Sequence, residues 1–456
     1  MPDVRAGVER TLAVLAWSAV LLPLWTWWFA RTVETLDAGM VAWGALAWFL
    51  VDAWRRNGWR AVEPSAKAYL IAASGLAAFC ALRPFLPITL CGVFGIVGGL
   101  PLLLPRTHDQ GELPTPLAGL AVAGLPSLLI LDLFLGVPLR WVSTVAATAL
   151  LRLTGLAVVR NGMEIAVGGV PVWVDAPCAG VKMLGTGVVL ALVLAQIGRL
   201  RFWRTVNVCT LAVVAVCAAN AARVAVLTVL AAAGHPMEGW AHEVVGCLAL
   251  LLALLIVALV PCLGKARKND SIGLVTPAGN TKLRFTAMAV FVVVAVVCIG
   301  WHPSSVREDD TAKGAESFPG WPKTFGGETL VEESQNELEQ VFAKDFPGRI
   351  GRFRAGDRQV ILLWTTRATH RVHGSVYCLR AAGWSIDPYP QERGDDGVWS
   401  VFRATRAGDS LVVREQVRCA DGTTFPDVPT WFFHAILGRS RGPWWIVTVA
   451  DAAMRL

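Results

Sequence analysis

Long apolar runs dominate the first two thirds of this sequence and constrain its fold more than any other feature. Runs able to cross about 30 Å of hydrocarbon, which takes about 20 helical residues, recur as far as Trp301 and then stop. The chain is 55% hydrophobic and only 16% charged, which is too apolar for a soluble protein of 456 residues. We therefore expect an α-helical polytopic membrane protein that continues into a soluble domain.

Nine apolar segments are predicted to span the membrane. They are residues 8–30, 39–54, 68–82, 85–105, 117–139, 179–198, 205–232, 241–263 and 285–300. The second and third are short, and Arg83 and Pro84 interrupt the chain before the fourth. No convincing small-residue cleavage pattern follows any segment, so we expect the first helix to be retained.

Basic residues predict the orientation, because Lys and Arg in short loops stay in the cytoplasm. Three clusters agree: Arg55, Arg56 and Arg60; Arg199, Arg201 and Arg204; and Lys265, Arg267, Lys268, Lys282 and Arg284. With nine spans, the amino terminus lies in the cytoplasm and everything after Trp301 lies outside. The net charge of +7 therefore reflects loop placement and does not indicate nucleic-acid binding.

Composition divides the chain into four parts: a transmembrane domain (1–264), a cytoplasmic loop with the last transmembrane helix (265–302), a polar linker (303–317) and a soluble extracytoplasmic domain (318–456). In the last part, β-prone runs occur at 360–365, 398–404, 410–417 and 444–450, and helical candidates at 333–343 and 431–437. This mixture predicts an α+β domain.

The predicted outer face between the fifth and sixth spans begins at Arg140. Residues 141–159 have the apolar spacing of a helix that lies in the membrane interface. Two short β-prone runs, 163–167 and 170–174, then predict a hairpin. The hairpin leads directly to Cys178.

The surroundings of Cys178 favour a reactive thiol. The cysteine follows Asp175 and lies at the expected start of the sixth span. A helix amino terminus carries partial positive charge and unpaired amides, which stabilise a thiolate and hold an oxyanion. The small residues Ala179 and Gly180 let another backbone or a substrate approach closely. Lys182, one turn on, either lowers the pKa of the thiol or has a structural partner.

Two further reactive residues are predicted at the same membrane face. Arg223 lies about 27 Å along the seventh span, near its outer edge, and shares a helix face with Asn220. A charged residue at membrane depth is costly unless it is paired or lines a cavity, so Arg223 is a functional candidate. His242 begins the eighth span, and Gly246, one turn below, opens room beside it.

These positions resemble the three motifs of the exosortase and archaeosortase family over about residues 60–265. The matching segments are Asp175-Ala-Pro-Cys178-Ala-Gly180-Val, Asn220-Ala-Ala-Arg223-Val and His242-Glu-Val-Val-Gly246. Two departures are Ala179, where many members have Ser, and Pro177. The resemblance implies a cysteine transpeptidase that acts on secreted proteins with a carboxy-terminal sorting signal, a transmembrane helix and a basic tail.

In that interpretation each residue has a role. The resemblance implies that Cys178 attacks the peptide bond, Arg223 stabilises the oxyanion, and His242 acts as general base and acid. Taken singly, Cys178 is explained as a small buried hydrophobe, Arg223 as a snorkelling residue and His242 as a helix cap. A second hypothesis is a non-catalytic membrane component of exopolysaccharide export that binds a lipid-linked anionic sugar. Neither hypothesis calls for a metal or an organic cofactor.

The soluble domain resembles, more loosely, the exopolysaccharide-biosynthesis domain that accompanies exosortases. The matching residues are Gly320-Trp-Pro, Trp364, Thr366, Arg367, His373, Cys378, Arg380, Gly383 and Trp384. Cys378 and Cys419 are its only cysteines, and an oxidising compartment favours a disulfide between them. The alternative is a second thiol site formed by His373 and Cys378.

Overall fold

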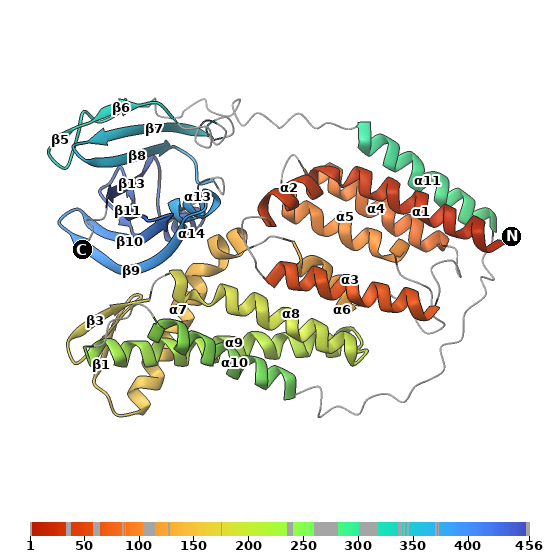
Figure 1. The fold of residues 1–456 in the computed structure, drawn as a ribbon, viewed down its shortest axis with the longest axis horizontal. Coiled ribbons are helices and arrows are strands. Elements are labelled where there is room, and N and C mark those ends of the chain that lie inside the picture. The colour runs from red at the N-terminus through yellow and green to blue at the C-terminus, as the bar shows by residue number, and fades with distance from the viewer. Residues whose placement is uncertain are drawn as a thin grey trace. The chain divides into compact units, whose positions relative to one another are not determined.

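The chain forms two compact units in a computed structural model. The structure describes residues 2–32, 38–57, 64–83, 86, 88–103, 115–125, 128–174, 176–234, 240–259, 281–300, 318–335, 340, 343, 346–369, 372 and 374–452. The first unit comprises Met1–Ser127, Lys182–Ala215 and Ala253–Arg307, and the second comprises Leu128–Val181, Val216–Leu252 and Glu308–Leu456. Figure 1 shows the elements along the chain.

The first unit is helical. Its elements are α1 (Pro2–Val20), α2 (Leu22–Thr32), α3 (Ala38–Asn57), α4 (Ala66–Leu82), α5 (Ile88–Leu103), α6 (Thr115–Ala123), α8 (Val181–Ile197), the first part of α9 (Phe202–Ala232), the end of α10 (Trp240–Leu259) and α11 (Thr281–Gly300). Leu76, Phe79, Ile96 and Phe291 are among the buried side chains of its core. The apolar faces of α4, α5 and α11 thus meet in a single core.

Two sets of polar contacts join helices within this core. The Trp17 indole N–H donates to the Gly95 carbonyl at 2.8 Å, which joins α1 to α5. Glu9 accepts hydrogen bonds from the Tyr69 hydroxyl at 2.7 Å and from Arg284 Nη2 at 3.2 Å. The Glu9 carboxylate therefore connects α1, α4 and α11.

Three described helices are long and apolar enough to cross a membrane, or four if a bent pair counts as one span. The three are Leu131–Leu153, Phe202–Ala232 and Lys282–Gly300, and the pair is Gly7–Val20 with Leu22–Phe29, bent by 66°. Shorter apolar helices occupy Gly39–Ala53, Ala66–Leu82, Ile88–Leu103, Val181–Ile197 and Glu243–Leu259. Nine crossings and their orientation stay a prediction.

The predicted fifth span is wrong as a single helix. Helix α6 ends at Ala123, and α7 (Leu128–Leu153) then runs without a break through Arg140. Gly124 and Pro126 account for the interruption, because Pro disfavours helical conformation in the residue before it. The expected interfacial helix 141–159 is therefore the second half of α7, and its end at Leu153 precedes a strand.

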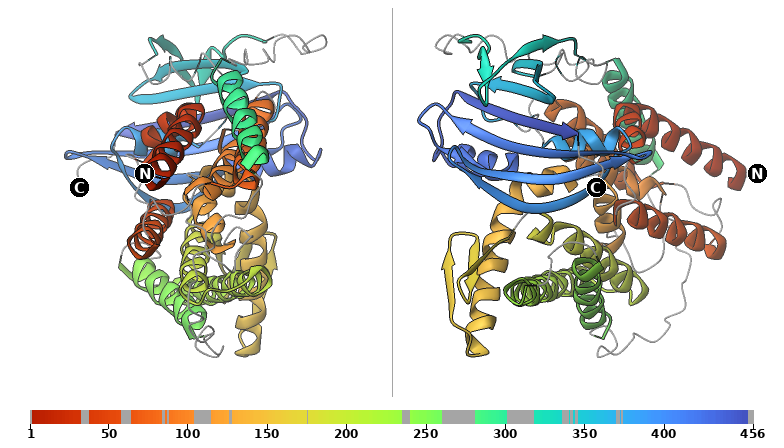
Figure 2. Two further views of the ribbon diagram at one scale, coloured as in Figure 1. Left: turned by 90° about the vertical axis from the view of Figure 1, so that its right-hand side faces the viewer. Right: turned by 60° about the vertical axis from the view of Figure 1, so that its left-hand side comes forward.

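The second unit places a small sheet beside α7. Strands β1 (Val158–Asn161), β2 (Glu164–Val167) and β3 (Val170–Trp173) form an antiparallel sheet in chain order. The predicted hairpin is confirmed as β2 and β3, and β1 extends it. Helix α7 runs across the part of α9 in this unit and not alongside it (Figures 1 and 2).

The carboxy-terminal part of this unit is an antiparallel sheet with two helices. Its strand order is β6 (Val331–Glu333), β7 (Gly348–Ala355), β8 (Arg358–Thr365), β13 (Trp444–Ala452), β11 (Asp409–Cys419), β10 (Gly397–Arg406) and β9 (Ser385–Gly394), with β12 (Thr424–Phe425) on β11. Helices α13 (Ser375–Ala381) and α14 (Val428–Ile436) and the small hairpin β4 (Thr324–Phe325) and β5 (Glu328–Thr329) complete it. We call residues 318–452 the C-terminal domain.

Most of the secondary structure predicted for this domain is confirmed. All four β-prone runs are strands, namely β8, β10, β11 and β13, and the helix predicted at 431–437 is α14, whose buried Trp431 packs edge-on against Trp444. The helix predicted at 333–343 lies largely outside the described residues, and Glu333 ends strand β6. The linker 303–317 also lies outside them.

Candidate active site

Cys178 lies in a short 3₁₀ turn that follows strand β3. The turn spans Ala176–Ala179, and α8 begins only at Val181. Cys178 therefore lies close to the helix start, as predicted, and the helix begins two residues later than the predicted span 179–198. Cys178 is 6% exposed and borders a small cavity lined by Val172, Trp173, Val174, Val224, Leu227 and Thr228. The thiol thus lies in mainly apolar surroundings between β3 and α9.

The side-chain amide of Asn220 fixes this turn from α9. Its Nδ2 donates to the Cys178 carbonyl at 2.8 Å and to Ser143 Oγ of α7 at 2.9 Å. Asn220 is 1% exposed, so both bonds are shielded from water. One amide therefore joins the cysteine turn, α7 and α9. From the sequence we predicted only that Asn220 shares a face with Arg223, and Ser143 was missed because no local pattern marks it.

Gly180 ends the turn in a conformation that other residues rarely adopt. Its φ is +77°, and a Cβ there would lie 2.9 Å from Asn220 Cγ. The absence of a side chain thus lets the Asn220 amide approach the backbone after Cys178. We predicted that Gly180 lets another backbone or a substrate approach closely, whereas in this structure the space beside it holds the Asn220 side chain.

Arg223 lies one turn beyond Asn220 on α9, is 8% exposed, and packs against α10. A Cβ on Gly246 would lie 3.4 Å from Arg223 Nε and 3.5 Å from its Cζ, so the guanidinium lies against the glycine backbone. The room predicted beside His242 stays a prediction, and the space next to Gly246 holds Arg223. The backbone of His242 lies one turn earlier on the same helix face.

Several predicted site residues fall outside what the structure describes. These are Asp175, His373 and the side chain of His242, so the approach of the His242 imidazole to Cys178 Sγ stays a prediction. Lys182 is exposed in the first turn of α8. Its effect on Cys178 also stays a prediction.

The disulfide expected between Cys378 and Cys419 is not formed. Cys419 is buried at the end of β11 and carries a free thiol, whose sulfur lies 3.3 Å from Ser440 Oγ. Burial raises the pKa of this thiol. Cys378 is exposed on α13.

Asp132 of α7 has a hydrogen-bond partner in the C-terminal domain. Its carboxylate accepts a hydrogen bond from the Tyr377 hydroxyl of α13 at 2.8 Å. Tyr377 lies 245 residues further along the chain. The C-terminal domain therefore contacts the helix that also carries Ser143.

Comparison with known proteins identifies the larger part of the chain. The family model described as transmembrane exosortase (Exosortase_EpsH) matches residues 15–259, a range that contains Cys178, Arg223 and His242. No curated protein and no solved structure matches. Since the match covers more than half of the 456 residues, this chain belongs to the transmembrane exosortase family.

Proposed function

We propose that this exosortase is a cysteine peptidase and transpeptidase of the cytoplasmic membrane. It cleaves carboxy-terminal sorting signals from secreted proteins at the outer membrane face. The observation that carries the proposal is the Asn220 amide, which holds the backbone of Cys178 at 2.8 Å from the same helix that presents Arg223 one turn away. This arrangement supports a shared site for Cys178 and Arg223.

The proposed reaction passes through a thioester. His242 takes the proton of the Cys178 thiol, and the thiolate attacks the carbonyl carbon of the scissile peptide bond, while the Arg223 guanidinium offsets the negative charge on the carbonyl oxygen. The C–N bond then breaks as His242 gives that proton to the leaving amine. An amine or water next gives a proton to His242 and attacks the thioester carbonyl. The C–S bond breaks, the acyl group is transferred or hydrolysed, and the proton returns from His242 to the Cys178 sulfur.

Burial of the site supports this division of roles. Cys178 and Arg223 are 6% and 8% exposed, so water is largely excluded around them. A cation stabilises a developing negative charge more strongly where water is excluded. The substrate reaches the thiol after side chains at the small cavity, including Trp173, move aside. The partners we propose are secreted proteins that end in a signal, a transmembrane helix and a basic tail.

The test uses substitutions at Cys178 in cells that produce a sorting-signal substrate. Cys178→Ala and Cys178→Ser should each lower processing by at least about 1,000-fold, because the nucleophile is lost. Cys217→Ala is the matched control, since Cys217 is a half-buried cysteine of α9 outside the cavity lining. Cys378→Ala tests the alternative thiol and should leave processing unchanged.

A second set of variants separates the remaining roles. Arg223→Gln should lower kcat by about 100- to 1,000-fold, as loss of an oxyanion donor does. His242→Gln should lower it by about 100- to 10,000-fold. Normal processing in Cys178→Ala cells would overturn the proposal. Loss of exopolysaccharide with intact processing would instead support the non-catalytic hypothesis.

A further inference from the structure

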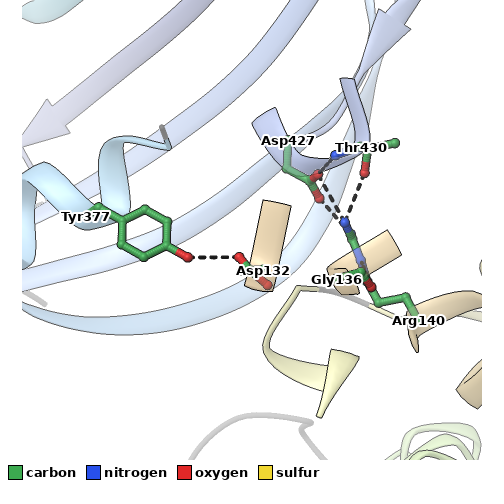
Figure 3. A network of polar contacts seen from close by, with 6 residues as sticks. All are labelled: Asp132, Gly136, Arg140, Tyr377, Asp427 and Thr430. Atoms are coloured by element: carbon green, nitrogen blue, oxygen red, sulfur yellow. Dashed lines mark hydrogen bonds and ion pairs between the residues drawn. The ribbon is translucent and has the colours of Figure 1, made fainter. Parts of the chain in front are cut away.

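A buried ion pair joins the C-terminal domain to helix α7. Arg140 Nη1 donates to Asp427 Oδ2 at 2.7 Å, and Nη2 donates to Asp427 Oδ1 at 3.2 Å and to Thr430 Oγ1 at 3.1 Å (Figure 3). Arg140 is 1% exposed and Asp427 6%. The contact is bidentate, a geometry that fixes the orientation of both groups.

Asp427 is also the amino-terminal cap of α14. Its Oδ1 accepts the backbone N–H of Thr430 at 2.7 Å. Burial alone would raise the pKa of this carboxyl, but the Arg140 charge and the hydrogen bonds from Arg140 and Thr430 hold its pKa below the usual range. One carboxylate therefore sets the start of α14 and its place on α7.

Further contacts extend the interface from Arg140 toward the amino-terminal end of α7. The Tyr377 hydroxyl donates to Asp132 at 2.8 Å, two turns before Arg140 on α7 (Figure 3). The rings of Phe134 and Phe432 meet edge to face with centroids 5.4 Å apart. Leu133 is 2% exposed within the core that also contains Phe432. The C-terminal domain thus uses part of α7 to complete its own core.

The energetics of such a pair favour a role in positioning. Removing two charges from water costs nearly as much as their attraction returns, so the intact pair adds little net stability. Removing one partner leaves the other charged and buried, which is strongly unfavourable. The Arg140–Asp427 pair therefore specifies one docked arrangement over alternatives in which either charge is buried alone.

From Arg140 a chain of buried contacts leads to the candidate nucleophile. Ser143 follows Arg140 by three residues on α7, and its Oγ accepts from Asn220 Nδ2, which also donates to the Cys178 carbonyl. Arg140, Ser143 and Asn220 are at most 3% exposed. A displacement of α7 therefore changes the support of the Cys178 turn.

A second, more exposed contact reaches the same turn from the other side. Arg393 of β9 pairs with Glu164 of β2 at 3.7 Å, and its guanidinium lies 5.7 Å from the centroid of the Trp173 ring. Trp173 in turn lines the cavity beside Cys178. The C-terminal domain thus contacts both α7 and the hairpin that flank the cysteine.

We propose that the C-terminal domain is a working part of the active site, in which Arg140 and Asp427 are positioning residues that hold the Cys178 turn through Ser143 and Asn220. This inference rests on the proposed function only where it concerns catalysis. The effect of the C-terminal domain on the Cys178 turn does not depend on the proposed function. The domain lies outside the family match, so the chain supplies this support in addition to the exosortase region.

The test measures alkylation of Cys178 by N-ethylmaleimide in the full chain in membranes, followed by mass spectrometry of the peptide that carries it. Asp427→Asn should raise the alkylation rate at least tenfold, because the buried Arg140 then lacks its counter-charge. Cys419, buried within the C-terminal domain, is the internal control and should react at its native rate. Glu392→Gln removes an exposed ion pair of the same domain and should change neither rate.

Two further variants keep the test decisive if Asp427→Asn folds poorly. Tyr377→Phe removes a single hydrogen bond and should raise Cys178 alkylation two- to fivefold. Arg140→Met combined with Asp427→Leu removes both charges and keeps an apolar contact, so alkylation should return to within about threefold of native. This return identifies docking, and not the charges themselves, as the positioning factor.

The outcomes separate the two proposals. Native alkylation of Cys178 in Asp427→Asn would overturn the coupling, as would an equal rise at Cys178 and Cys419, which indicates unfolding of the domain. A rise in alkylation at Cys178 alone supports the coupling, whatever the processing assay shows. If Cys178→Ala cells also processed the substrate normally, the proposed function would be refuted and the coupling would not.

Discussion

Each of the two units contains a buried polar network built on one carboxylate, and the two differ in what they connect. In the first unit, the Glu9 carboxylate accepts hydrogen bonds from Tyr69 and Arg284 and joins three helices of one bundle. In the second, the Asp427 carboxylate accepts hydrogen bonds from Arg140 and joins a helix of the exosortase region to a separate sheet domain. The chemistry is alike, and the structural consequence is not.

The difference shows how a polar contact acquires a functional role. The Glu9 network lies among helices whose apolar faces already pack together, so its loss affects mainly the packing of α1. The Arg140 network lies three residues from Ser143, which holds Asn220 and through it Cys178. We therefore expect the loss of the carboxylate to affect Cys178 in the Arg140 network and not in the Glu9 network.

The largest expected effect comes from removing the negative charge of each of the two carboxylates. Asp427→Ala should destabilise the docked α14 by about 3 to 5 kcal/mol, because it leaves Arg140 buried and removes the helix cap. Glu9→Gln should cost about 1 to 2 kcal/mol at α1, because Tyr69 keeps an acceptor and only Arg284 loses its charged partner. Native-state hydrogen exchange of the α14 and α1 amides measures both. If the two variants were destabilised equally, or if Glu9→Gln changed the alkylation of Cys178, the two networks would not differ in function.

A second buried carboxyl gives the second unit a dependence on pH. Glu415 is 5% exposed and accepts the Ser375 N–H at 2.6 Å. Burial raises the pKa of Glu415 to about 7, although the Ser375 hydrogen bonds lower it in part. Since the pKa of the folded protein exceeds that of the unfolded chain, this group stabilises the fold below about pH 4.5, and its contribution is lost as the pH rises through about 7.

Glu415→Gln removes this dependence. The variant should match the native protein at pH 4.5 and exceed it by about 3 kcal/mol at pH 8, because Gln is never ionised. Hydrogen exchange of the β11 amides at the two pH values measures the difference. An advantage of the variant that is the same at both pH values would refute this assignment. The comparison would then rest on Asp427 alone.

Local sequence patterns predicted the secondary-structure elements better than the contacts between them. The four β-prone runs and the hairpin before Cys178 were found from alternation and turn residues. Arg140 was interpreted as the end of a span because charge usually marks a loop. Its partner lies 287 residues away, a distance over which no periodic pattern carries information.

The candidate site shows the same limit at closer range. The sequence placed Cys178 at a helix start, since Pro177 and the apolar run that follows favour one there. The actual start lies at Val181, because Gly180 has a φ of +77°, which lies outside the helical region. The Asn220 side chain lies where a Cβ on Gly180 would be, a contact between two segments that no local pattern indicated.

Gly180 provides a test of that contact within the second unit. Gly180→Ala should cost about 2 to 3 kcal/mol, because φ is +77° and the new Cβ would lie 2.9 Å from Asn220 Cγ. Gly234→Ala is the matched control: its φ is +83°, but no atom lies within 4 Å, so only about 1 kcal/mol of backbone strain is expected. Alkylation of Cys178 should rise only in Gly180→Ala. A similar rise in both would assign the effect to backbone strain alone.

The smallest effect is expected at Arg393, the exposed contact between the C-terminal domain and the hairpin. Its side chain is 67% exposed and that of Glu164 is 17% exposed, so water screens the pair. Arg393→Ala should therefore cost less than about 1 kcal/mol and change Cys178 alkylation by less than about threefold. Alkylation of the Cys178 peptide in the full chain measures this against Asp427→Asn. A larger change at Arg393 would place the main support of Cys178 on β2 and β3, because the Trp173 ring would then transmit more than the buried ion pair on α7.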